Sequence, residues 1–320
     1  AAAAPAGGGT EEVTTPDKVL KFTDQNAEDS PAGMWEQKFA DLVKEYTKGH
    51  IEVELYFNNT LCGYDIQPLQ AGICDFIQYV PSSAGDLDSR LGAFDAPYIY
   101  RDADHRLAVF DPFNSEPLKV INEALKDDGV MLLSSFNSGY RQITCNFPIR
   151  NLSDMKGAKI RVVPSDLYQQ LFTAFGAAAT PMAFSEVPTA LITNVIDGQE
   201  NPYSVIVSSA LYEVQKYCME TNHLPTNHGL WMNRNTYESL TPEQQEAVLK
   251  AAYDASAYMD KYILDKVEEY KKICEDNGME IIDAENGLDI DGFKAAAENV
   301  YDYFAEDWGD MPDLIRAVQP

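Results

Sequence analysis

The sequence predicts an α/β protein of two lobes, on three grounds. The chain has 320 residues, which is long for a single hydrophobic core and suits two. Buried strand-like runs alternate with amphipathic segments, an order typical of parallel strands joined by crossover helices. A helical pattern in the C-terminal third is longer than one lobe requires, so it predicts a helix that crosses both.

The first lobe is predicted to contain four buried strands, at residues 18–23, 51–57, 73–80 and 130–136. Ser30-Pro31 supplies an N-cap and a first helical residue, so a helix should run to about Lys48 and end at Gly49. A short helix is expected over 65–71. The order strand–helix–strand–helix–strand implies a parallel sheet.

A second unit opens with AKIRVV, a strand over 158–163. Its helix is predicted over 165–175, and a short helix over 185–194 follows. Residues 242–275 are then predicted to form the long helix. This stretch contains no glycine and no proline after Pro242, and its apolar residues recur at helical spacing. Thr241 and Gln244 form a capping box at its start. A coiled-coil partner helix is the alternative, but the apolar stripe is too irregular for sustained heptads.

The charge balance excludes several classes of partner. The formal net charge is −27, which argues against nucleic acid and against anionic lipid. No apolar run of 18 residues or more is long enough to span a bilayer. Since an acidic surface repels anions at long range, an anion site must place its cations locally.

Motifs for catalysis and cofactors are missing. The chain has no GxSxG, HExxH, P-loop or GxGxxG motif, so we expect no enzyme and no cofactor. The five cysteines and four histidines show no zinc-like spacing, and residues 283–292 lack a calcium-loop register, so no metal is expected. A hydrolase using paired acids stays an alternative, opposed by the lack of a nucleophile motif.

Four side chains are candidates for binding an anion. Arg161 lies inside an apolar strand pattern, and Arg141 precedes the strand-like QIT; a guanidinium fork binds a carboxylate through two parallel hydrogen bonds. An internal ion pair with one of the 51 acids is the alternative for both. Asn201, before Pro202, could donate to and accept from an oxygen-bearing ligand, and Phe184 precedes a capped helix.

Several long motifs then carry a resemblance, in order along residues 17–315: QAGICDF (70–76), FDAPYIYRDADH (94–105), GYRQIT (139–144), DMKGAKIRVVPS (154–165), PMAFSEVPTAL (181–191), VIDGQENP (195–202), LYEVQKY (211–217) and TNH (221–223). The chain resembles the extracytoplasmic solute receptors of TRAP transporters, the DctP-type family, which includes sialic-acid and C4-dicarboxylate binders. The resemblance implies a two-lobed periplasmic-binding-protein-like fold that closes by a hinge on a small organic anion. It also implies that the receptor works as a monomer with one small and one large membrane subunit.

The resemblance also assigns roles to the candidates. Arg161 would pair with the ligand carboxylate, Arg141 and Asn201 would assist, and Phe184 would pack on the ligand. Contacts from the first lobe are expected among Asn26, Asp65, Tyr79 and Phe94. A module that presents the solute to a signalling partner is the alternative function.

The expected domain division follows the same family. Residues 1–16 are low-complexity and polar and should form a flexible tether. Lobe I is expected to comprise 17–138 plus 226–262, and lobe II 139–225 plus 263–320. A cloning tail is one interpretation of the tether; the other is a spacer after a lipidated cysteine preceding residue 1, which agrees with a periplasmic or other extracytoplasmic location.

Overall fold

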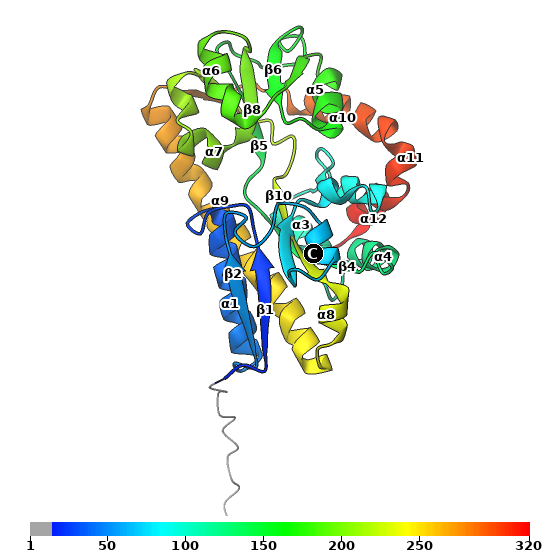
Figure 1. Ribbon diagram of the computed structural model, residues 1–320. Helices are drawn as coiled ribbons and strands as arrows, with labels where there is room; N and C mark the ends of the chain where they lie inside the picture. Colours follow the sequence, from blue (N-terminus) through cyan, green and yellow to red (C-terminus); the bar gives the residue numbers. More distant parts are fainter. Residues whose placement is uncertain (1–14) are drawn as a thin grey trace, which may run out of the picture.

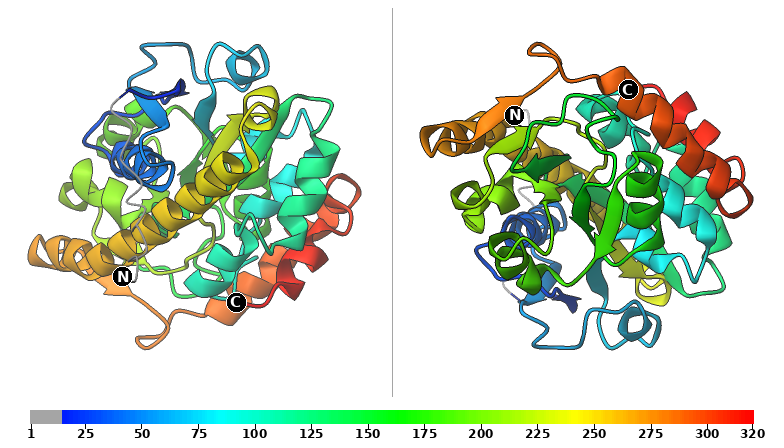
Figure 2. Two further views of the ribbon diagram at one scale, coloured as in Figure 1. Left: turned by 90° about the horizontal axis from the view of Figure 1, so that it is seen from below. Right: turned by 90° about the horizontal axis from the view of Figure 1, so that it is seen from above.

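The computed structural model describes residues 15–320, so most of the predicted tether lies outside the described part. Two lobes lie one above the other and share the long helix α9 (Pro242–Asp276) (Figure 1). Seen from below, α9 runs diagonally across the molecule (Figure 2). Within residues 15–320, no helix is both long enough and apolar enough to cross a membrane.

Lobe I is built on a five-stranded sheet. Its order is β2 (Ile51–Tyr56), β1 (Lys18–Thr23), β3 (Phe76–Tyr79), β10 (Asn227–Asn233) and β4 (Val130–Asn137). Its helices are α1 (Pro31–Tyr46), α2 (Gln67–Gln70), α3 (Ala103–Val109), α4 (Glu116–Ala124) and α8 (Arg234–Glu238), with 3-10 turns η1 (Pro81–Ala84) and η2 (Ser89–Asp95). The predicted N-cap forms, since Ser30 Oγ accepts from Gly33 N at 3.1 Å.

Lobe II is built on a six-stranded sheet. Its order is β11 (Glu280–Ile282), β9 (Tyr217–Met219), β5 (Arg141–Cys145), β8 (Gly198–Pro202), β6 (Lys159–Val162) and β7 (Ala178–Pro181). Its helices are α5 (Asp166–Ala174), α6 (Val187–Ile192), α7 (Tyr203–Ser208) and α10 (Ile290–Tyr303), with η3 (Phe184–Glu186) and η4 (Leu211–Glu213). The predicted two-lobed α/β fold is confirmed, and antiparallel pairs enter both sheets through β10 and β5.

The C-terminal end differs from the expected division. The sequence predicts lobe II for residues 263–320, whereas α11 (Ala305–Trp308) packs on η2 and α12 (Met311–Ala317) packs on α4 and η2, all in lobe I. The chain therefore returns to lobe I after α10. No local pattern predicts this return, because short amphipathic helices fit either lobe equally well.

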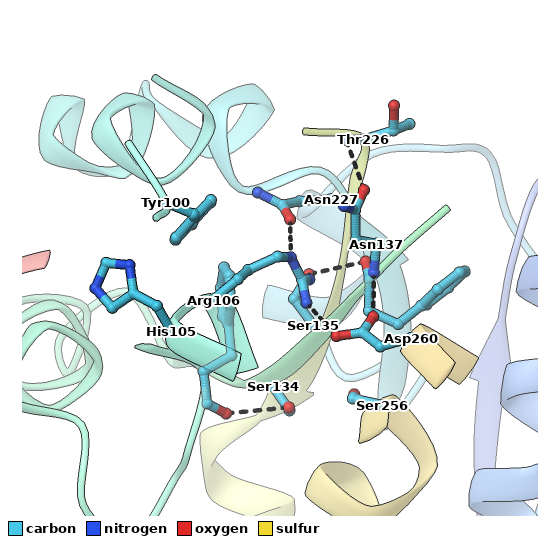
Figure 3. A network of polar contacts seen from close by, with 12 residues as sticks. Tyr100, His105, Arg106, Ser134, Ser135, Asn137, Thr226, Asn227, Ser256 and Asp260 are labelled. Atoms are coloured by element: carbon cyan, nitrogen blue, oxygen red, sulfur yellow. Dashed lines mark hydrogen bonds and ion pairs between the residues drawn. The ribbon is translucent and has the colours of Figure 1, made fainter. Parts of the chain in front are cut away.

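The lobes are joined by two extended segments and by α9. The segments after β4 and before β10 are hydrogen-bonded to each other, through Ser138 N to Thr226 O at 3.0 Å and Arg141 N to Leu224 O at 2.9 Å. Close by, the guanidinium of Arg106 donates to Asp260 of α9 at 2.7 Å, and Asp260 accepts from Asn137 N at 2.7 Å (Figure 3). Arg106 is 1% exposed. This buried network fixes the middle of α9 to the hinge.

Candidate functional site

Three of the predicted anion-binding residues come together on neighbouring strands of lobe II. Arg141 begins β5, Asn201 lies near the end of β8, and Arg161 lies in β6. Strand β8 runs between the other two. All three side chains are buried, so residues far apart in the sequence form one polar group inside the sheet.

Arg141 is already paired with an acid of the protein. Its Nε and Nη2 donate to the Glu200 carboxylate, with Nη2 to Oε1 at 2.8 Å, and Nη2 also reaches Asn201 Oδ1 at 3.1 Å. Burial opposes the guanidinium charge, but the charge of Glu200 outweighs it, so the pKa of Arg141 is raised. The alternative of an internal ion pair therefore applies to Arg141.

Glu200 has a second partner in His223. The imidazole Nε2 lies 3.3 Å from Glu200 Oε2, and Nδ1 lies 2.8 Å from the Thr221 hydroxyl. Burial favours the uncharged form of both groups, which lowers the pKa of His223; for Glu200, the charge of Arg141 and the bond from His223 overcome burial and lower the carboxyl pKa. Arg141 and Glu200 therefore form a nearly neutral pair with a neutral histidine behind it.

Within residues 15–320, Arg161 has no such acidic partner. Its Nε and Nη2 donate to the carbonyl oxygen of Met182, at 3.0 and 2.8 Å. Among the described residues, the only carboxylate that acts on its charge is Glu200, which is bonded to Arg141. Burial lowers the pKa of Arg161. Two of the five guanidinium N–H groups are used within the protein, and the remainder can receive an anion.

Aromatic rings flank both guanidinium groups. The Arg161 guanidinium carbon lies 5.6 Å from the ring centre of Phe184, which is 36% exposed. The Arg141 guanidinium lies 5.3 Å from the ring centre of Tyr168 in α5. Phe184 therefore lies beside Arg161 and keeps a face that a ligand can cover.

The candidates in lobe I are placed less uniformly. Asn26 is half-buried, and its amide donates to both Asp24 carboxylate oxygens at 3.0 Å. Tyr79 ends β3 and packs on Tyr64, with ring centres 4.7 Å apart. Asp65 is exposed and accepts from Gln67 N at 3.1 Å. Phe94 is 0% exposed inside the lobe I core, so its side chain offers no surface to a ligand in this structure.

Two hollows lie where the lobes meet. One groove of about 260 Å³ is lined by Ser82 of lobe I and by Ser165 and Leu167 of lobe II, so the chain that follows β6 faces the chain that follows β3. The other, of about 300 Å³, lies at the hinge on the α9 side and includes Arg106 and Asp260. Neither is lined by Arg161.

Sequence reasoning missed the partners of the arginines. Glu200 stands within the DGQENP motif, and an acid in the middle of a wholly buried strand was a usable signal. His223 and Tyr168 gave no comparable signal, because a lone histidine or tyrosine in an apolar context is most often core. The carbonyl of Met182 can be recognised only from the structure.

Comparisons with known proteins agree with this geometry. The model of the bacterial extracellular solute-binding proteins, family 7 (DctP), matches residues 22–307. The 2,3-diketo-L-gulonate-binding periplasmic protein YiaO of Escherichia coli is 30% identical over 93% of this chain and 90% of that protein. The C4-dicarboxylate-binding periplasmic protein DctP of Shewanella loihica is 32% identical over 81% of this chain and 76% of its own.

Solved structures show the same fold. A TRAP periplasmic solute-binding protein of Rhodobacter sphaeroides superposes with a TM-score of 0.86 at 29% identity, over 94% of this chain and 99% of that one. One of Xanthobacter autotrophicus with bound β-D-galacturonate gives a TM-score of 0.78 at 29% identity, over 94% and 100%. The chain therefore belongs to the bacterial extracellular solute-binding proteins of family 7, the DctP family of periplasmic TRAP receptors, and is a transport receptor, not an enzyme.

Proposed function

We propose that this receptor captures a small organic carboxylate between its lobes, with Arg161 as the anchor. The observation that carries the proposal is the contrast between its two buried arginines. Glu200 neutralises Arg141, whereas Arg161 has an unbalanced charge and unused N–H groups. Burying an ion is favourable only when its charge is paired and its hydrogen bonds are made, and a ligand carboxylate would supply both.

The other predicted residues take supporting roles in this proposal. Arg141 and Asn201 supply further hydrogen-bonding groups beside Arg161, and Phe184 packs on the ligand. Relatives bind 2,3-diketo-L-gulonate, β-D-galacturonate and L-galactonate, which supports a sugar acid as the solute. The lobes, dividing near residues 139 and 226, would close on it by a hinge motion.

The transport partners complete the proposal. A monomeric receptor would deliver its solute to one small and one large TRAP membrane subunit. A lipid on a cysteine preceding residue 1 would hold it at the membrane. Mass spectrometry of the native protein tests the lipid attachment, since a diacylglycerol adduct is expected and an unmodified N-terminus would contradict it.

Calorimetry tests the anchor role of Arg161. A thermal-shift screen of organic acids first identifies a binder, since ligands of the folded state raise its melting temperature by mass action. Arg161→Met should then lose about 2–5 kcal/mol of binding free energy for that acid. Lys159→Met is the matched control, because Lys159 lies on the same strand but is exposed. Unchanged affinity in Arg161→Met, or no acid that shifts the melting temperature, would refute the proposal.

A further inference from the structure

A group of polar side chains lies at the edge of the lobe I sheet that faces lobe II. This lobe I polar cluster consists of the buried Asp24, Trp35, Glu36 and Gln78 and the half-buried His228. Asp24 follows β1, Gln78 lies near the end of β3, and His228 lies at the start of the antiparallel β10. The carboxyl ends of parallel strands are where ligands bind in α/β folds.

Strand alternation directs these side chains to one face. Phe22 and Phe76 belong to the core between the sheet and α1, and Asp24 and Gln78 follow each of them by two positions, on the same face. Phe136 connects Trp35 with His228. Its ring centre lies 4.8 Å from that of Trp35, and its ring is stacked on the His228 imidazole with the centres 4.6 Å apart. Glu36 follows Trp35 in α1, and its carboxyl group lies close enough to that of Asp24 to be influenced by its charge.

The cluster is incomplete within the protein. Among the described residues, no donor reaches either carboxyl oxygen of Glu36, and Trp35 Nε1, Gln78 Oε1 and His228 Nδ1 also have no hydrogen-bond partner. Glu36 and Trp35 are 0% exposed. An unpaired buried polar group is unfavourable, so several of them in one place favour a ligand that both donates and accepts hydrogen bonds.

The lobe I polar cluster contains two carboxyl groups and no lysine or arginine. Burial and the charge of the neighbouring Asp24 raise the pKa of Glu36 well above its usual range, which favours the uncharged form of the Glu36 carboxyl group. Burial lowers the pKa of His228 to about 4, which leaves the ring neutral. No lysine or arginine occurs in the chain segments at this edge, which are residues 23–30, 56–66, 79–89, 134–140 and 226–229.

The nearby cation of lobe I is unavailable to a ligand. Arg106 at the hinge is bonded to Asp260, Asn227 and Ser135. A second ligand carboxylate would therefore meet Asp24 and Glu36 without a counterion. Like charges at such distances are strongly unfavourable in a desolvated site.

We propose that the lobe I polar cluster is the second half of the binding site and selects a monocarboxylate whose opposite end donates hydrogen bonds, through hydroxyl groups or a cationic nitrogen, to Asp24. The inference rests on the proposed function, because it takes Arg161 as the site of the carboxylate. Asp24 is the contact, and Asn26 positions it by holding both its oxygens. Glu36, which lies beside Asp24, is a positioning residue. Dicarboxylates are rejected.

Calorimetry with three probes at pH 7 tests the selection. D-galacturonate offers hydroxyl donors, ectoine offers a cationic nitrogen, and succinate offers a second carboxylate. At least one of the first two should bind at least about tenfold more tightly than succinate. Asp24→Asn should weaken that binding by about ten- to a hundredfold, the range of one charge-assisted hydrogen bond. Asp29→Asn, an exposed acid in the same loop, is the matched control and should leave it unchanged.

Glu36→Gln provides a second variant if Asp24→Asn does not fold. It should leave carboxylate recognition at Arg161 in place and abolish the pH dependence of affinity that the titration of Glu36 causes, which a merely structural role would not change. Tighter binding of succinate than of the donor-bearing probes, or full affinity in Asp24→Asn, overturns the inference while leaving Arg161 as the anchor. Failure of all three probes and of every other organic acid refutes the proposed function itself.

Discussion

The replacement Arg141→Met is expected to destabilise the folded protein severely, because it leaves a buried carboxylate without its counterion. The Arg141 and Glu200 side chains are 6% and 0% exposed. Once the guanidinium is removed, Glu200 keeps only the neutral His223 ring, at 3.3 Å. Breaking a buried ion pair in this way costs about 3–5 kcal/mol.

A double-mutant cycle separates this effect from simple loss of packing. Arg141→Met/Glu200→Met removes both charges and should recover about half of the loss or more, since apolar residues of similar volume often replace a buried pair at little cost. Urea denaturation at pH 7 measures the free energy of unfolding of each variant. Arg161→Met should cost less than Arg141→Met, because no acid loses its partner. The reasoning would be refuted if Arg141→Met costs less than about 1 kcal/mol, or if the double variant is no more stable than Arg141→Met.

Three further predictions concern other buried groups. The pKa of Glu36 is raised above the usual value of 4.5, so protonation of Glu36 stabilises the folded state at low pH, and this contribution is lost as pH rises through the folded pKa. In urea denaturation, the stability of Glu36→Gln relative to wild type should therefore increase from pH 5 to pH 8. An equal difference between the two proteins at both pH values would contradict this. Asp260→Ala should cost about 3–5 kcal/mol because it leaves Arg106 buried without an acid, whereas Asp265→Ala, in an exposed pair on the same helix, should have little effect. Of the five free thiols, Cys62 alone is half-buried and should be alkylated first by iodoacetamide at pH 8, while burial raises the pKa of Cys145 to about 11; equally fast labelling of a second cysteine, seen by mass spectrometry, would contradict this.

Much of the fold could be predicted because its signals are local. The cap at Ser30, the capping box of Thr241 with Gln244, and the uninterrupted pattern of α9 depend on neighbours within a few residues, and each forms as predicted. Strand periodicity identified most strands of the lobe I sheet in the same way. The placement of β10 and the return of α12 to lobe I depend on contacts between distant segments, which periodicity does not encode.

By itself, the sequence determined the two-lobed α/β fold, the family, and the residue types suited to an anion, including both arginines. Only the tertiary structure decided which arginine is free. Arg141 and Glu200 are 59 residues apart and meet because β5 pairs with β8, while the Arg161 guanidinium on the far side of β8 is hydrogen-bonded, among the described residues, only to a carbonyl oxygen. The physical reason is that the net charge of a buried group depends on which partners lie within hydrogen-bonding distance, and strand pairing, not residue type, sets those distances.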